Sequence, residues 1–334
     1  MRAPGRRLAA LAAAAAFAAL AVSAPAQPDL SSDGLLRDHL WSELTALPKG
    51  RRPVVGLALS GGAARAAAHT GVLTVLTRAR FPIDVVAGTS MGAIIGALYA
   101  AGDPPSRLRA IMRSITIETG TNWGAMSLLR LVLGQKPLTN RKTEEALIRE
   151  FGPKRFEDLA KPFACVAMDL DSGEKIIFRD GPVTRAVRAS SSLPGIIEPV
   201  EYRQRFLVDG GVIDDVPVDA AKLLGAQWVL ASVTESDFTR SRPRTALQSL
   251  QQVLDIRGSI LAREQIQEAN FVIDSAVGAI PFYDASKIPE AIDAGIVAAQ
   301  QRLPAAEERL ILSSLPWLLK DAGSAPPAAE IVRK

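Results

Sequence analysis

Histidine is scarce in this chain of 334 residues, which contains only His39 and His69. Both precede Ser90, the central residue of Gly88-Thr89-Ser90-Met91-Gly92, which has the G-x-S-x-G pattern of a nucleophile elbow. Enzymes with that elbow usually place a histidine base after the serine in the chain. The absence of any later histidine excludes this order, so a nucleophilic Ser90 would need a different base.

Other absences narrow the function classes further. The single cysteine, Cys165, excludes an intrachain disulfide. Three of the 39 basic residues and none of the 35 acidic ones lie in the first 26 residues, so the rest of the chain is nearly neutral. Without a basic block there is no nucleic-acid footprint and no strong attraction to anionic membranes. Since no group of His, Asp and Glu has ligand spacing, we predict neither a metal nor another cofactor.

The N-terminus has the order of a secretory signal peptide. Arg2, Arg6 and Arg7 form a basic region, residues 8–22 are apolar, and Ala24-Pro25-Ala26 is an A-x-A cleavage site. The apolar run is too short to span a bilayer as a helix. We therefore expect cleavage after Ala26 and a periplasmic or secreted protein; a cytosolic N-terminal helix is the alternative.

The rest of the chain divides into a lead-in at 27–50, a catalytic domain at 51–305, and a C-terminal helix with a frayed tail at 306–334. Two strand–turn–helix units open the domain, and this order predicts a parallel sheet covered by helices. The first unit has a strand at 53–59 and a helix at 63–79; the second has a strand at 83–87 and a helix at 91–101. Further strands are predicted at 163–170, 175–178, 205–208, 228–233 and 271–273. Further helices are predicted at 35–47, 184–190, 245–268 and 291–301, with a looser helical pattern over 106–151.

The first of these turns, Ser60-Gly61-Gly62-Ala63-Ala64-Arg65, is rich in glycine. Backbone N–H groups at such a turn can bind a phosphate or an oxyanion. The turn lacks both the G-x-G-x-x-G spacing of dinucleotide sites and the Gly-Lys-Ser/Thr of a P-loop. An oxyanion hole is therefore favoured over a nucleotide site, with a plain tight turn as the structural alternative.

The second turn carries Ser90. A serine hydroxyl is a poor nucleophile unless it is positioned and its proton is removed. The strand-to-helix turn positions it, and Gly88 and Gly92 remove side chains that would collide there. Asp209, in Leu207-Val208-Asp209-Gly210-Gly211, is the candidate base because no histidine is available. An aspartate is ordinarily a weak base, with a pKa of about 3.9, but burial would raise that value.

Taken together, these motifs resemble those of the patatin-like phospholipase family. The resemblance rests on the glycine-rich loop at 60–65, the elbow at 88–92, and Asp209-Gly210-Gly211. The segment 188–195, Arg-Ala-Ser-Ser-Ser-Leu-Pro-Gly, also resembles the family's sequence ahead of the aspartate. The likeness extends over residues 54–303.

The resemblance implies a three-layer α/β/α fold with a mostly parallel central sheet. It also implies hydrolysis of lipid acyl esters, phospholipid or lysophospholipid, by a Ser90–Asp209 dyad that needs no metal. The partner would be the lipid substrate, with transient contact to a membrane surface and no nucleic acid. The remaining implied site residues are those of the oxyanion loop: backbone amides of Gly61, Gly62 and Ala63, with Arg65 as support.

The chain departs from the family pattern at Ala63 and Ala66, where two glycines are expected. If either position requires a positive φ, alanine costs about 1 kcal/mol or more. This departure motivates an alternative function, a catalytically weak lipid-binding protein that keeps the fold. A nucleotide-binding α/β protein is a weaker alternative.

Three further features are given structural interpretations. His69 is expected to be a packed core residue rather than a catalyst. Asp214 and Asp215 are expected to be turn or surface residues. The stretch 123–133 is expected to belong to the core, with a lipid-facing lid as the alternative.

Overall fold

The computed structural model describes residues 31–114, 138–235, 237, 242–244, 246–281 and 284–322. The chain forms two compact units, residues 1–43 and 44–334. The predicted helix of the lead-in is present as α2 (Ser32–Ala46). The predicted signal peptide, the stretch 123–133 and the end of the tail lie outside the described residues.

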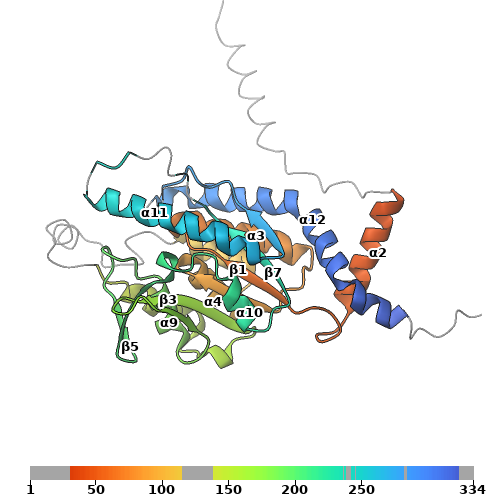
Figure 1. The fold of residues 1–334 in the computed structure, drawn as a ribbon, viewed down its shortest axis with the longest axis horizontal. Coiled ribbons are helices and arrows are strands. Elements are labelled where there is room, and N and C mark those ends of the chain that lie inside the picture. Colours follow the sequence, from red (N-terminus) through yellow and green to blue (C-terminus); the bar gives the residue numbers. More distant parts are fainter. Residues whose placement is uncertain are drawn as a thin grey trace, which may run out of the picture. The chain divides into compact units, whose positions relative to one another are not determined.

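The larger unit is built on one sheet with the strand order β5-β6-β3-β2-β1-β7-β8, and β4 pairs with β3. The strands from β3 to β8 in this order pair in parallel, and the strands at the β5 end of the sheet pair antiparallel (Figure 1). This arrangement confirms the predicted α/β class with a mostly parallel sheet. The parallel strands are β1 (Val55–Leu59), β2 (Val85–Thr89), β3 (Phe163–Asp169), β7 (Trp228–Val233) and β8 (Phe271–Asp274). The antiparallel strands are β4 (Lys175–Phe178), β5 (Val200–Tyr202) and β6 (Arg205–Asp209).

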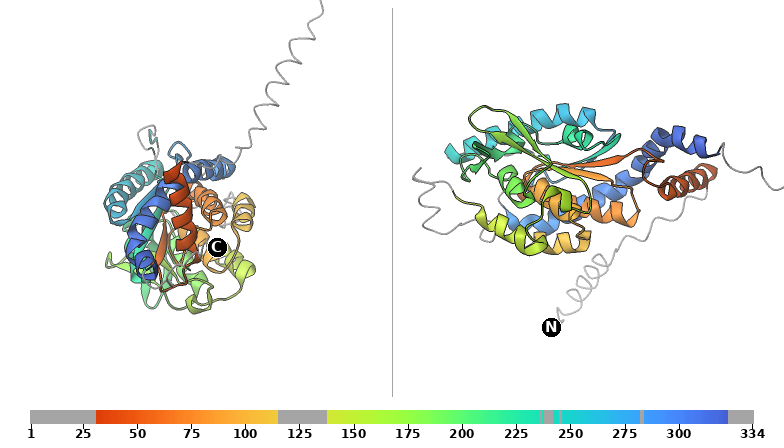
Figure 2. Two further views of the ribbon diagram at one scale, coloured as in Figure 1. Left: turned by 90° about the vertical axis from the view of Figure 1, so that its right-hand side faces the viewer. Right: turned by 90° about the horizontal axis from the view of Figure 1, so that it is seen from below.

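Helices cover both faces of this sheet, which gives the three layers that the sequence predicts (Figure 2). On one face lie α10 (Val218–Leu223) and α11 (Ala246–Gln265), and on the other lie α3 (Ala68–Arg78) and α4 (Met91–Ala100). The remaining helices are α5 (Pro105–Ser114), α8 (Arg141–Phe151), α9 (Val183–Ser190) and α12 (Ile288–Ala322). No helix within the described ranges combines the length and apolarity needed to cross a membrane.

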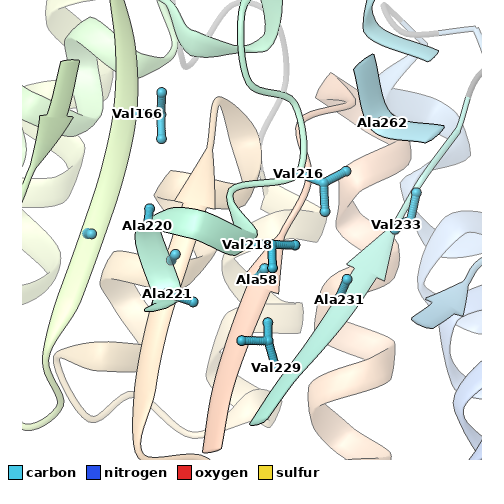
Figure 3. Close-up of a cluster of buried hydrophobic side chains, with 12 residues drawn as sticks. Ala58, Val166, Val216, Val218, Ala220, Ala221, Val229, Ala231, Val233 and Ala262 are labelled. Carbon is cyan, nitrogen blue, oxygen red and sulfur yellow. The ribbon is translucent and has the colours of Figure 1, made fainter. Parts of the chain in front are cut away.

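The alternation of side chains along β1 shows how the two faces differ. Ala58 points toward α10 and joins a cluster of small residues there, including Ala87, Ala164 and Ala231 (Figure 3). Leu59 points to the opposite face, where it lies with Val86 and Phe163 near Gly96 of α4. The alanines allow the short helix α10 to lie close to the sheet. The large side chains on the other face fill the space beneath α4.

Sheet register brings the predicted nucleophile and base together although 119 positions separate them. The last residue of β2, Thr89, pairs with Val166 of β3, and β3 continues beyond that point to Asp169. The antiparallel strand β6 enters at this far end of β3 and runs back, so its last residue, Asp209, pairs with Ala167. Asp209 therefore ends beside the residues that follow β2.

The structure departs from the predicted elements in three places. Helix α12 runs continuously through Pro304, so the boundary predicted at 305 falls inside a helix. The sequence interpretation missed β5 and α10, which have three and six residues. Elements this short do not complete a recognisable period of apolar residues.

Candidate active site

Ser90 lies in a strained turn between β2 and α4. Its φ of 55° and ψ of −124° are unusual for a residue with a side chain. The Ser90 N–H donates to Ser190 Oγ at 3.0 Å, and this hydroxyl supports the turn from α9. Ser90 Oγ donates to Asp209 Oδ2 at 2.6 Å. Since Ser90 is partly exposed, its hydroxyl is both paired with a carboxylate and accessible.

The glycines that flank Ser90 are required by close approach of the backbone. A methyl group on Gly88 would lie 2.5 Å from the carbonyl oxygen of Gly92. A methyl group on Gly92 would overlap the carbonyl oxygens of Leu59 and Ser60. The elbow after β2 is thus in direct contact with the loop after β1, and a change in one displaces the other.

Asp209 is buried at the end of β6, with 4% of its surface exposed. Its Oδ1 accepts a hydrogen bond from Gly211 N at 2.8 Å, and its Oδ2 accepts from Ser90. Burial raises the pKa of Asp209 to about 6, against the two hydrogen bonds, which lower it. A carboxylate with a pKa near neutrality is a better proton acceptor than an exposed aspartate.

The glycine-rich loop has both bound and available backbone amides. Gly61 is fixed, because its N–H donates to Asp215 O at 3.2 Å and its carbonyl accepts from Thr234 Oγ1 at 2.7 Å. The Gly62 N–H has no acceptor among the described residues. Ala63 begins a short 3-10 helix, η1 (Ala63–Ala67), and the first N–H groups of a helix have no acceptor within it. Of the three amides predicted for an oxyanion hole, those of Gly62 and Ala63 remain available.

The two alanines of this loop differ in backbone conformation. Ala63 has a φ of 47°, so it occupies the left-handed region that favours glycine. Ala66 lies inside η1, is fully buried and has no such strain. The departure from the family pattern therefore carries a conformational cost at Ala63 but not at Ala66.

Replacing Ala63 by glycine is expected to stabilise the protein by about 1 kcal/mol, because glycine adopts a positive φ without a Cβ clash. We also expect a modest rise in kcat on a small ester with KM unchanged, since a better-placed amide acts on the transition state. Thermal unfolding and steady-state kinetics measure the two effects. Ala66→Gly is the matched control and should instead destabilise the protein by about 1 kcal/mol; equal effects at the two positions would contradict the strain argument.

His69, in α3, is a packed core residue that supports this loop, and the core position agrees with the sequence prediction. It is fully buried, with Nδ1 2.8 Å from Ser232 Oγ and Nε2 3.0 Å from the Ser60 carbonyl oxygen. A carbonyl only accepts, so Nε2 carries the proton and Nδ1 accepts from the serine hydroxyl. Burial lowers the pKa of His69 to about 4, which keeps the ring neutral. His69 thus holds the loop through Ser60 rather than removing a proton from Ser90.

Arg65 is buried and ties the loop to α11. Its guanidinium lies 3.4 Å from Asp255 Oδ1 and 3.5 Å from the carbonyl oxygen of Ile280. Through these contacts Arg65 fixes the position of η1 relative to α11.

The interpretation as a turn or surface residue is wrong for Asp214, whereas Asp215 does lie in a bend. Asp214 is 1% exposed, its carbonyl accepts from Thr89 Oγ1 at 2.9 Å, and its carboxylate forms an ion pair with Lys175 at 3.2 Å. Asp215 is partly buried, with its side chain against Gly61. The chain after Asp209 folds back toward the ends of β1 and β2, and both carboxyls follow it inward. Sequence position alone gave no sign of this return.

Across the described ranges, no three His, Cys, Asp or Glu side chains are grouped closely enough to hold a metal ion.

Comparison with known families and proteins identifies similar sequences. The family model of patatin-like phospholipases matches residues 57–222, which include the loop, the elbow and Asp209. The lysophospholipase nte1 of Aspergillus fumigatus is 35% identical over 178 residues, which are 53% of this chain and 12% of that protein. Patatin-like phospholipase domain-containing protein 6 of Homo sapiens is 37% identical over 186 residues, 53% of this chain and 13% of that protein. The chain therefore spans only a small part of these curated relatives.

Among solved structures, human GIVD cytosolic phospholipase A2 is similar to this chain with a TM-score of 0.45 and 13% identity. The similarity covers 82% of this chain and 63% of that one.

Proposed function

Because the chain belongs to the patatin-like phospholipase family, we propose that it hydrolyses lipid acyl esters with Ser90 as nucleophile and Asp209 as base. The observation that carries this assignment is the 2.6 Å hydrogen bond from Ser90 Oγ to Asp209 Oδ2. A serine that already donates to a buried carboxylate with a raised pKa is arranged for nucleophilic catalysis. Phospholipid or lysophospholipid is the proposed substrate class, supported by the names of the relatives.

The reaction has two acyl-transfer steps. Ser90 Oγ attacks the ester carbonyl carbon while Asp209 accepts the hydroxyl proton. The tetrahedral intermediate expels the alcohol, which takes that proton, and leaves an acyl-Ser90 ester. A water molecule then attacks the acyl carbon, gives its proton to Asp209, and releases the fatty acid as Ser90 recovers its proton.

The negative oxygen of each tetrahedral intermediate requires hydrogen-bond donors. We assign this role to the N–H groups of Gly62 and Ala63, whose loop contacts the serine turn. The N-terminus of α4, which follows Ser90 directly, adds a favourable dipole. One such donor is worth roughly 10²- to 10³-fold in turnover.

A second candidate function follows from the strained Ala63. If the loop does not hold its amides toward the acyl oxygen, the chain would bind lipid and turn it over poorly. We also propose that the protein is exported, because residues 1–26 have the order of a secretory signal peptide.

The proposed function is tested with an alkyl fluorophosphonate and with lysophosphatidylcholine. We expect the phosphonate to label the protein once, with the modified peptide containing Ser90, and the lysolipid to be hydrolysed to a fatty acid. Prior labelling should abolish hydrolysis. Lysolipid binding without labelling or turnover would contradict the hydrolase assignment and support the lipid-binding alternative.

A further inference from the structure

Asp215 places a second carboxyl group beside the candidate catalytic residues. A methyl group built on Gly61 would lie 2.6 Å from Asp215 Oδ1 and 3.5 Å from Ser90 Cβ. A methyl group built on Gly211 would lie 3.2 Å from Asp209 Oδ1 and 3.3 Å from Asp215 Oδ1. The Asp215 carboxyl is therefore a neighbour of the Ser90 side chain across Gly61 and of the Asp209 carboxyl across Gly211.

This location matters because negative charge develops next to it during the reaction. The intermediate carries an oxyanion near the loop that starts at Gly61, and like charges in a partly buried site repel strongly. An ionised Asp215 would raise the energy of that oxyanion and attract the loop's N–H groups to itself. A neutral Asp215 would do neither.

We propose that Asp215 is a positioning residue of the active site, which supports turnover when neutral and suppresses it when ionised. The proposal rests on the proposed function, since it assumes an oxyanion at Ser90. Asp215 acts through the Gly61 loop and through its charge, and no step transfers its proton to substrate.

The charged groups around Asp215 come from four places in the fold. Asp209 of β6 and the adjacent Asp214 contribute negative charge. Arg65 of η1 contributes positive charge, which is partly balanced by its ion pair with Asp255 of α11. Arg257, also on α11, is turned to the carbonyl oxygen of Val212, to which its Nε donates at 2.6 Å.

These surroundings favour the neutral form. Burial raises the pKa of Asp215 to about 7, and the charges of Asp209 and Asp214 add to the effect, while Arg65 and the Gly61 N–H oppose it. Asp209, with a pKa of about 6, ionises first as the pH rises. The base is then ready above pH 6 and Asp215 is still neutral below pH 7, so activity is confined to a narrow interval near neutrality.

The pH dependence of kcat/KM on p-nitrophenyl butyrate tests the proposal, with Ser90→Ala as the blank for spontaneous hydrolysis. In the wild type we expect a rise through pH 6 and a fall above pH 7 of about tenfold per pH unit. Asp215→Asn should keep the rise and lose the fall, so that at pH 9 it is about 100-fold more active than the wild type. Asp215→Glu, which restores a titrating carboxyl, should restore a fall.

Asp274→Asn is the matched control. Asp274 is the last residue of β8, and burial and the charge of Glu235 raise its pKa to about 6, so it titrates in the same interval. For this variant, kcat/KM should still rise through pH 6 and fall above pH 7. A merely structural role for Asp215 would change activity equally at all pH values, without removing one limb.

A wild-type fall above pH 7 that persists in Asp215→Asn would overturn the proposal and leave the hydrolase assignment intact. So would a folded Asp215→Asn without activity at any pH. If asparagine prevents folding, Asp215→Ser provides a second uncharged variant with the same expected profile. A wild type no more active than Ser90→Ala would instead contradict the proposed function itself.

Discussion

Ester hydrolysis is expected to fall by about 10⁴-fold or more when Ser90 is replaced by alanine, because the acyl-enzyme can no longer form. The fold should survive. Alanine keeps the Cβ of serine, so the strained φ of 55° is no worse in the variant. The loss is one hydroxyl and its hydrogen bond to Asp209, which costs about 1 kcal/mol of stability.

Steady-state hydrolysis of a small ester and thermal unfolding measure both effects. Ser191→Ala is the matched control, since the Ser191 hydroxyl donates to the carbonyl oxygens of Val187 and Arg188 within α9. It should remain close to the wild type. Turnover in a homogeneous Ser90→Ala preparation within tenfold of the wild type would show that another residue is the nucleophile.

The sequence was sufficient where local pattern determines structure. The apolar runs predicted β1, β3 and β7 because strands buried on both faces have few polar residues. The turn at Ser90 was predictable because only glycine fits at Gly88 and Gly92, where a methyl group would meet backbone carbonyls. The core position of His69 was also predictable, and the structure places the ring fully buried in α3.

The sequence was insufficient where the structure depends on the pairing of strands that lie far apart in the chain. Nothing in the sequence between Ser90 and Asp209, which are 119 positions apart, indicates that β3 extends beyond β2 and that β6 runs back along β3. The burial of Asp214 and the inward position of Asp215 depend on the same path, because the chain after β6 turns back toward the ends of β1 and β2. Likewise, the sequence showed that Ala63 replaced a glycine but not that Ala63, rather than Ala66, has the positive φ.

Replacing Asp209 by asparagine is expected to move activity and stability in opposite directions. Turnover should fall by about 10⁴-fold, because an amide cannot accept the Ser90 proton and the two residues act as a unit. His69→Ala is the comparison, since its neutral ring is bonded to Ser60 and Ser232 and should matter more for folding than for chemistry. Loss of turnover in folded His69→Ala together with retention in Asp209→Asn would reverse the assignment of the base.

The stability change follows from the raised pKa of Asp209. Since the folded-state pKa is about 6 and the unfolded value is 3.8, folding favours the neutral carboxyl. That contribution is fully present below pH 4 and is lost as the pH rises through 6, so above pH 7 the ionised carboxylate destabilises the wild type by about 3 kcal/mol.

Asparagine carries no charge, so the Asp209→Asn variant should unfold at higher denaturant concentration than the wild type at pH 8, by roughly 2 kcal/mol in the free energy of unfolding. The difference should shrink as the pH falls to 4. A variant that is less stable than the wild type at pH 8 would mean that Asp209 is ionised at little cost in the folded protein, and the account of its basicity by burial would be wrong.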